Sequence, residues 1–420
     1  MIDSARHFLP VGNIKRMIDG MSTAKLNVLH WHLTDIESFP VQSERYPLLS
    51  GKGAFRPNMV YTRANMSEIV TYAGLRGIRV VPEFDIPGHA GWVFGHPEIT
   101  IRAPASCQWN PLDPTLDRTY IFLRNFLEEM ATIFTDPMLH LGGDEASFIN
   151  CVNSTGAPWV KAHNLTSASL WPYFWERVFR EVLATGTLAN KTIQLWEQTG
   201  LVNFGGGGAG GWDTNVHPWK ALWRKVNTKP GTGFNLYTDL NAILNATALR
   251  GVPAILSAPY YLDDTLATHQ ESADSKGGVA IHRCHGGPSE FNWINSIWKC
   301  FYGVAPDDDV PAELATNTSL VMGGEACIWG EGTAGPSIES QVLTSASAVA
   351  ERLWSGRGST IGSPSCPGRG MAGGGFISGT ECRLGHHVCL MNRLGLGASP
   401  VTPGYCDIGS PADFERFRVL

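Results

Sequence analysis

The stretch Val11–Asp35 reads VGNIKRMIDGMSTAKLNVLHWHLTD and predicts a helix followed directly by a strand. Apolar residues recur at helical spacing over Val11–Ala24, and the run Lys25–Leu33 then predicts a strand. His32 and Asp35, which are residue types used in catalysis, stand at the end of that strand. The stretch therefore predicts one unit of an α/β fold with polar groups at a strand terminus.

The same alternation continues along the chain. Further strands are predicted at Gly77–Phe84, Met138–Leu141, Lys191–Trp196, Pro253–Ala258 and Leu320–Trp329, and helices at Asn65–Arg76, Thr115–Phe134, Ser167–Ala184, Leu240–Arg250 and Ile338–Trp354. Alternating strands and helices favour parallel βαβ units, and about eight of them favour a (β/α)8 TIM barrel over an open sheet. Chemistry-bearing residues recur at the strand ends, where barrels place their active sites.

Composition fits one globular barrel domain over residues 1–420. Charged residues make up 17% and hydrophobic residues 43% of the 420, so a large core can form. The net charge of −6 gives no electrostatic basis for nucleic-acid binding, and no apolar run of about 18 residues predicts a membrane span. Gly-rich insertions are expected near 204–211 and 356–375, followed by a Cys-containing tail over 376–420.

Cysteines and glycosylation sequons favour an oxidising compartment. The nine cysteines form no C-x-x-C pair, and their odd number leaves at least one thiol if the others pair. Six N-x-S/T sequons are present, at Asn65, Asn153, Asn164, Asn190, Asn245 and Asn317. We expect a glycoprotein with disulfides that is lysosomal or secreted. The first residues lack a signal-peptide pattern, so we expect that this segment is missing from the chain.

Three motifs carry groups suited to catalysis. His140–Glu145 (HLGGDE) ends a predicted strand in two glycines and two adjacent carboxylates. Adjacent carboxylates at a turn can approach one site from different directions, although acids at a helix N-terminus give the same pattern. His30–Asp35 contains an H-x-H pair, which is also typical of metal sites. In Pro82–His89 (PEFDIPGH), His89 could orient a carboxylate, bind a metal or be structural.

Taken together, seven segments resemble the family 20 glycoside hydrolases, the β-N-acetylhexosaminidases. They are Asp3–Pro10 (DSARHFLP), Lys25–Asp35 (KLNVLHWHLTD), Val80–Ala90 (VVPEFDIPGHA), His140–Glu145 (HLGGDE), Ser257–Asp263 (SAPYYLD), Gly323–Glu331 (GGEACIWGE) and Ala348–Trp354 (AVAERLW). They occur in the family's order, and the lysosomal α and β subunits look most similar. The family usually has a small α/β domain before the barrel; we expect that this domain is missing here, that the first strand is truncated at about Met1, and that two sheet edges are exposed.

The resemblance implies removal of terminal non-reducing β-linked GlcNAc or GalNAc by a retaining, substrate-assisted mechanism. In that mechanism the acetamide oxygen of the substrate attacks the anomeric carbon and forms an oxazolinium intermediate. Glu145 matches the general acid that protonates the leaving oxygen. Asp144 matches the residue that orients the acetamide and stabilises its developing positive charge. The resemblance implies no protein nucleophile, no cofactor and no metal.

Polar substrate contacts carry over by position. Arg6 and Glu331 match the pair that holds the 3- and 4-hydroxyls of the sugar. Tyr261 matches the hydroxyl that donates to the acetamide carbonyl. Asp263 matches the residue near the 6-hydroxyl, where a carboxylate would repel a 6-sulfate and favour neutral sugars.

The acetamide pocket and the tuning of the acid also carry over. Asp35 and His89 match the dyad that tunes the general acid. Trp196 and Trp329 match walls of the acetamide pocket, whose apolar faces exclude water. The family has a third Trp on its sixth strand. Here the aligned segment is Gly233–Tyr237, so Tyr237 is expected to replace that Trp.

The resemblance further implies disulfides Cys107–Cys151 and Cys389–Cys406. The expected substrates are N-acetylhexosamine-terminated glycans, glycolipids or chitin oligomers, and a homodimer is a further expectation for which the sequence shows no interface.

Two other functions remain open at this stage. A metal-dependent barrel hydrolase would use His30, His32, His89 and Asp144, and it predicts bound zinc and sensitivity to chelators. An inactive sugar-binding fragment of the family predicts binding of N-acetylglucosamine without turnover.

Overall fold

The fold is taken from a computed structural model that describes residues 1–101, 111–144, 148, 157–166, 169–196, 223–226, 254–257, 260–263, 297–303, 321–355 and 377–401. No described helix is long and apolar enough to cross a membrane.

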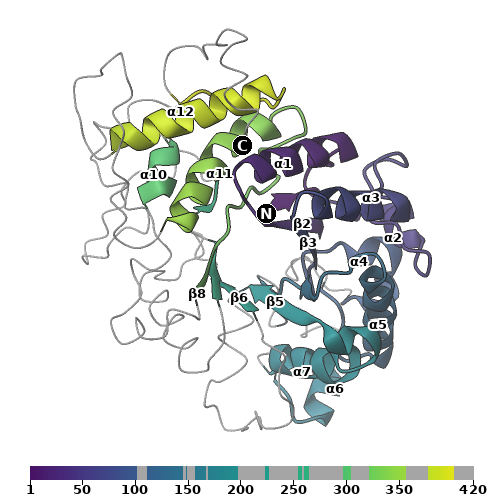
Figure 1. The fold of residues 1–420 in the computed structure, drawn as a ribbon. Coiled ribbons are helices and arrows are strands. Elements are labelled where there is room, and N and C mark those ends of the chain that lie inside the picture. Colours follow the sequence, from purple (N-terminus) through teal and green to yellow (C-terminus); the bar gives the residue numbers. More distant parts are fainter. Residues whose placement is uncertain are drawn as a thin grey trace, which may run out of the picture.

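Parallel strands in sequence order form the centre of the molecule (Figure 1). Within the described residues they are β1 (Ile2–Asp3), β2 (Val28–Thr34), β3 (Arg79–Phe84), β4 (Met138–His140), β5 (Thr192–Trp196), β6 (Trp223–Val226), β7 (Ala254–Leu256) and β8 (Val321–Gly324). Each pairs in parallel with the next, and a parallel bridge joins Ile2 to Ile328, just after β8. The first and last strands therefore meet, and the sheet closes into the predicted TIM barrel.

Helices cover the outside of the barrel (Figure 1). They are α1 (Val11–Thr23), α2 (Leu48–Gly53), α3 (Arg63–Gly74), α4 (Trp92–Gly95), α5 (Asp117–Ala131), α6 (Ala157–Ala162), α7 (Leu170–Arg177), α10 (Ile297–Gly303), α11 (Ile338–Trp354) and α12 (Ile377–Arg393), with short 3-10 or π-helical turns at Pro97–Ile99, Val178–Leu183 and Gly186–Asn190. Helix α1 packs against both α3 and α11, so the helical layer is continuous across the junction between the first and last strands. Its buried stripe contains Ile14, Met17, Ile18 and Met21, as helical periodicity requires.

Local sequence accounts for where these helices begin. The N-terminus of α3 is a capping box in which the side chain of Thr62 accepts the N–H of Asn65 and Asn65 accepts the N–H of Thr62. Pro10 precedes α1, and the carbonyl of Pro10 accepts the N–H groups of Asn13 and Ile14. These short-range signals fix the helix starts before any packing is considered.

The predicted order of strands and helices is confirmed wherever both are described. The predicted helix Leu240–Arg250 and the Gly-rich segments 204–211 and 356–375 lie outside the described residues. The placement of the sixth strand is corrected: it is Trp223–Val226, because that segment pairs with β5 on one side and β7 on the other, whereas Gly233–Tyr237 was expected there.

The expectation of two exposed sheet edges is wrong at the carboxyl ends of the strands, because β1 contacts both of its neighbours there. Although β1 has only two residues, Ile2 and Asp3 pair with Trp31 and His32, and Ile2 also bridges to Ile328. A very short strand therefore suffices to join both neighbours.

Part of the C-terminal tail packs on the barrel's outer layer. Helix α12 contacts α11 (Figure 1). Cys382 and Cys389 on α12 are both disulfide-bonded, while Cys327 is a buried thiol. The pairings Cys389–Cys406 and Cys107–Cys151 involve Cys406, Cys107 and Cys151, which lie outside the described residues, and they stay predictions.

Candidate active site

Polar and aromatic side chains from several strands gather at the carboxyl ends of the barrel. The predicted site residues found there are Arg6, Asp35, His89, Asp144, Trp196, Tyr261, Asp263, Trp329 and Glu331, whereas Glu145 and Tyr237 lie outside the described residues. Because parallel strands end at the same edge, residues far apart in sequence meet here.

Arg6 is held by carboxylates on several sides. Its guanidinium lies 3.0 Å from Asp3 Oδ2, 2.9 Å from Asp35 Oδ2 and 3.3 Å from Glu37 Oε2. It also stacks 5.1 Å from the ring centre of Trp329. Burial opposes its charge, but Asp35, Asp3 and Glu331 outweigh that effect and raise the pKa of Arg6 above its usual value. The site thus contains a fixed positive charge with an aromatic face beside it.

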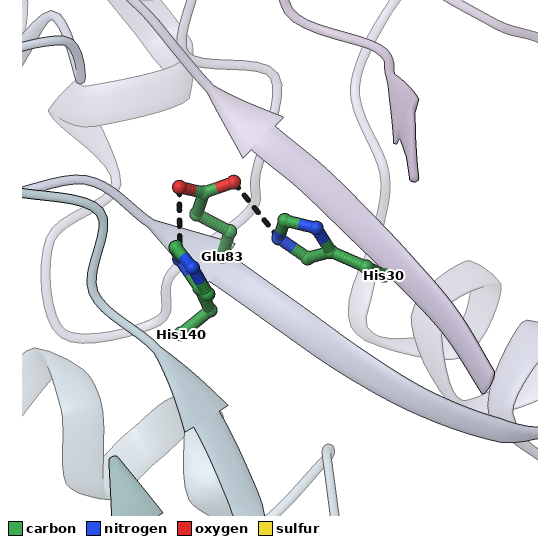
Figure 2. Close-up of side chains that lie close together, drawn as sticks. All are labelled: His30, Glu83 and His140. Atoms are coloured by element: carbon green, nitrogen blue, oxygen red, sulfur yellow. Dashed lines mark ion pairs between the residues drawn. The ribbon is translucent and has the colours of Figure 1, made fainter. Parts of the chain in front are cut away.

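Four nitrogen atoms lie within 2.9 Å of the two carboxylate oxygens of Glu83, at the end of β3. Its Oε2 lies 2.8 Å from His30 Nε2 and 2.7 Å from His32 Nδ1. Its Oε1 lies 2.9 Å from His140 Nδ1 and accepts the indole N–H of Trp196 at 2.7 Å. Figure 2 shows His30 and His140 meeting the two oxygens of this carboxylate from β2 and β4. Glu83 is fully buried, so each contact is shielded from water.

A hydrogen-bonded chain runs from Glu83 to His89. His32 Nε2 lies 2.8 Å from Asp35 Oδ2, and His89 Nδ1 lies 3.1 Å from Asp35 Oδ1. Burial opposes a charge on His32, yet Glu83 and Asp35 on either side raise the pKa of this imidazole to about 10. Burial also opposes ionised Asp35, but hydrogen bonds from His32 and His89 and the charge of Arg6 hold its pKa below the usual range. At neutral pH ionised Glu83, protonated His32 and ionised Asp35 therefore alternate in charge.

Asp85 lies directly beneath the turn that carries Asp144. Its Oδ1 accepts the N–H of Gly143 at 2.8 Å. Gly142 has φ +59°, and a Cβ added there would lie 2.0 Å from the carboxyl carbon of Asp85. Burial, the charge of Asp144 and that of Glu83 raise the pKa of Asp85 well above its usual value. The raised pKa favours the protonated form of Asp85, which is hydrogen-bonded to Asp144.

An aromatic cluster separate from the main core stands beside these acids. It consists of Met1, Trp196, Tyr261, Cys327 and Trp329. The ring centre of Trp329 lies 5.7 Å from that of Trp196 and 6.0 Å from that of Tyr261. Burial and the nearby Cys327 and Asp144 raise the pKa of Tyr261 well above 10, so its phenol keeps its proton.

Asp263 lies at the edge of this cluster. Its Oδ1 accepts the backbone N–H of Trp329 at 3.4 Å. The cluster therefore presents apolar faces and one neutral hydroxyl near the carboxyl of Asp144.

The four residues expected for a metal-dependent hydrolase do not form one set in the described structure. His30 and His32 both reach Glu83, as their alternation with Trp31 predicts, but His89 binds Asp35. A different trio, His30, Glu83 and His140, offers donor atoms within 4.8 Å of one another.

Sequence reasoning gave no role to Glu83 or Asp85. Both stand in the segment Pro82–His89, whose density of acids at a strand end was the available signal. Neither acid can be linked to its partners without the fold, because those partners lie on other strands.

Comparison with known proteins identifies a similar family. Residues 1–357 match the catalytic domain of glycosyl hydrolase family 20. The chain is 32% identical over 419 residues to the β-hexosaminidase subunit β of Mus musculus, covering 97% of this chain and 65% of the mouse protein. It is also 32% identical to β-hexosaminidase 3 of Arabidopsis thaliana, covering 96% of this chain and 62% of that one. The chain thus spans just under two-thirds of these relatives.

Solved structures show the same fold. An exo-β-N-acetylglucosaminidase from Vibrio harveyi in complex with N-acetylglucosamine superposes with a TM-score of 0.68 at 23% identity, covering 96% of this chain and 58% of that one. A chitobiase from Flavobacterium johnsoniae gives the same TM-score and identity, covering 94% and 52%.

Proposed function

The chain belongs to glycosyl hydrolase family 20, and from this we propose that it is an exo-acting β-N-acetylhexosaminidase. It would hydrolyse terminal, non-reducing β-linked GlcNAc or GalNAc with retention of configuration. Its relatives in mouse and Arabidopsis are β-hexosaminidases, which supports this activity.

The single observation that carries the proposal is Asp144 beside both an acid of raised pKa and an aromatic cluster. The raised pKa of Asp85 favours a proton on that acid, which would leave the negative charge of the pair on Asp144. Tyr261, whose phenol interacts with Asp144, packs with Trp196 and Trp329, and the cluster offers apolar walls with one hydroxyl donor. An acetamide, with an N–H donor, a carbonyl oxygen and a methyl group, matches this combination of groups.

In the proposed first step, the acetamide carbonyl oxygen forms a bond to the anomeric carbon as the bond to the leaving oxygen breaks. Glu145 gives its proton to that leaving oxygen, and Asp144 accepts the acetamide N–H and stabilises the positive oxazolinium. In the second step, water attacks the anomeric carbon, Glu145 takes its proton, and the acetamide is restored.

The remaining predicted contacts are proposed as substrate-binding groups. Arg6 and Glu331 would hold the 3- and 4-hydroxyls, because the guanidinium is fixed by Asp3 and Asp35 before substrate arrives. Tyr261 would donate to the acetamide carbonyl, and Asp263 would face the 6-hydroxyl. Tyr237 is proposed as a further pocket wall.

We also propose the natural substrates, the assembly and the location of the protein. N-acetylhexosamine-terminated glycans, glycolipids or chitin oligomers fit the site chemistry, and a homodimer is proposed as the assembly. Two disulfide-bonded cysteines on α12 and six sequons support a lysosomal or secreted protein. Residues 1–420 are proposed to act as one catalytic domain.

Hydrolysis of a chromogenic β-N-acetylglucosaminide, with and without a thiazoline mimic of the cyclic intermediate, tests the proposal. We expect turnover that the mimic inhibits and a chelator does not. Binding of N-acetylglucosamine without turnover would contradict the enzyme assignment, and turnover abolished by the chelator would favour metal-dependent hydrolysis.

Substitution of the two acids tests their roles. Glu145→Gln is expected to lose most activity on substrates with poor leaving groups, since these need protonation most. Full activity in both Glu145→Gln and Asp144→Asn would exclude the proposed mechanism.

A further inference from the structure

The carboxylate of Glu83 joins two parts of the candidate site that otherwise lie on separate strands. Through Oε1 it holds the indole N–H of Trp196, a proposed wall of the acetamide pocket. Through Oε2 it holds His32, which leads to Asp35 and His89, the proposed dyad that tunes the acid. None of the roles proposed above uses Glu83 itself.

The trio His30, Glu83 and His140 could in principle bind a metal ion, but its contacts favour another reading. Each Glu83 oxygen already lies within 2.9 Å of two nitrogen atoms. The second ring nitrogen of His30 lies 2.8 Å from Glu325 Oε1. These three side chains are at most 3% exposed, so substrate could not reach an ion held between them. Glu83 accepts N–H groups from His32 and Trp196 and forms ion pairs with His30 and His140, which is the geometry of a buried, paired carboxylate.

We propose that Glu83 is a positioning residue that fixes the Trp196 pocket wall and the His32–Asp35–His89 chain in one arrangement. This inference rests on the proposed function, because Glu83 would affect the rate only through the acetamide pocket and the general acid. Glu83 touches no substrate in this account. It would act by holding the Trp196 pocket wall and the His32–Asp35–His89 chain at fixed positions relative to each other.

The electrostatics agree with this geometry. The charged groups that face this chain are His30, His140 and Glu325 around Glu83, and Asp3, Asp35, Arg6 and Asp85 around the remainder. Burial opposes a charge on Glu83, yet the three imidazoles hold its pKa well below the usual range. Glu83 in turn helps to keep His32 protonated, and His32⁺ keeps Asp35 ionised as the acceptor for His89.

Glu83→Gln tests the proposal because it keeps the side-chain shape and removes the charge. We expect kcat/KM to fall about 100-fold, the effect of a misplacement of about 1 Å. Removal of the negative charge also lowers the pKa of His32, so the alkaline limb of the kcat/KM profile moves to lower pH. In imidazole NMR, His32 should titrate at lower pH than in the wild type.

Glu129→Gln is the matched control. Glu129 on α5 is another buried carboxylate, and it accepts the hydroxyl of Ser43 and the N–H of Glu44, each at 2.6 Å, away from the site. Its loss should lower stability but leave the pH profile unchanged. Trp196→Phe, which removes the indole donor to Glu83 and keeps a smaller aromatic wall, tests the pocket route separately and should raise KM more than it lowers kcat.

Three outcomes would overturn the inference. They are a Glu83→Gln enzyme with wild-type kcat/KM and pH profile, an equal kinetic change in Glu129→Gln, and one zinc per wild-type chain that Glu83→Gln loses. If Glu83→Gln does not fold, an unchanged KM in Trp196→Phe would overturn the pocket route. An inactive wild-type enzyme would instead exclude the proposed function, while the NMR titration of His32 would still test the contact with Glu83.

Discussion

At the scale of single residues, the division of charge between Asp85 and Asp144 matters most. The two carboxyls are hydrogen-bonded, and ionisation of both in a buried site is energetically unfavourable. Asp85 is the more enclosed of the two, since its side chain lies beneath Gly142 and Gly143. The raised pKa of Asp85 favours a proton on that acid, and we expect Asp144 to keep the negative charge that an oxazolinium needs.

Paired amide substitutions test this division. Asp85→Asn keeps a neutral side chain with an acceptor for Gly143 and a donor for Asp144, so we expect less than about a tenfold loss in kcat. Asp144→Asn removes the charge and should cost about 100-fold or more. Equal losses in steady-state kinetics of the two variants would show that the charge is assigned to the wrong acid.

At the scale of structural elements, the turn after β4 depends on the absence of a side chain at Gly142. Gly142→Ala would impose a left-handed conformation on alanine, at a cost of about 1–2 kcal/mol, and drive its Cβ into the Asp85 carboxyl. We expect lower stability in urea unfolding and loss of activity together.

Gly12→Ala on α1 is the control for that substitution. Gly12 has no atom within 4 Å of an added Cβ and no positive φ, so the change should be neutral or stabilise the protein by up to about 1 kcal/mol. If Gly142→Ala behaves like Gly12→Ala, the close contact with Asp85 is not a constraint on the site.

Elements whose signals are local could be predicted from the sequence. The alternation around Val11–Asp35 identified α1 and β2, and the same logic identified β3 to β5. It misplaced β6, because Trp223–Val226 is defined by pairing with β5 and β7 and not by its own short pattern.

Prediction of the site was limited in the same way, because contacts between distant segments have no local sequence signal. The HLGGDE, PEFDIPGH and HWHLTD motifs marked the strand ends that carry Asp144, His89 and Asp35. The role of Glu83 could not be predicted, because its partners His32 and Trp196 are 51 and 113 residues away in sequence. Such contacts exist only once the barrel has closed.

At the scale of the whole molecule, Asp3 stabilises the junction between the first and last strands of the barrel. Its carboxylate accepts the N–H of Ala5 at 2.8 Å and the N–H of Gly330, after β8, at 3.0 Å, and it pairs with Arg6. Asp3→Ala leaves these buried donors without their acceptor. We expect a loss of roughly 3 kcal/mol in the free energy of unfolding and a raised KM through Arg6.

Asp19→Ala is the matched control for Asp3→Ala. Asp19 pairs with Arg76 on the partly exposed outer surface, where such a pair contributes at most about 1 kcal/mol. Equal changes in the two variants during denaturant unfolding would contradict a special role for Asp3 in closure.

The buried charge network also predicts how global stability varies with pH. Glu83 and Asp35 have lowered pKa values when folded, so their contribution is present above the unfolded values of 4.5 and 3.8 and is lost as pH falls. His32 has a raised pKa, so its contribution is complete below 6.5 and is lost as pH rises towards about 10. Stability from these groups should therefore be highest at about pH 4.5–6.5.

Unfolding by urea across pH 4 to 10 checks this window. Glu83→Gln should flatten the alkaline decline, because His32 then gains less from folding. Stability that rises from pH 7 to 10 in the wild type would contradict the charge assigned to His32.

The most direct test of the central claim compares two aryl glycosides that differ only in the N-acyl group, acetamide and trifluoroacetamide. Three fluorines withdraw electron density from the carbonyl oxygen, so a reaction in which that oxygen attacks must slow sharply. We predict that kcat/KM of the wild-type enzyme falls by at least about 100-fold for the trifluoroacetamide. Rates equal within about threefold would show that the substrate's own acyl group is not the nucleophile.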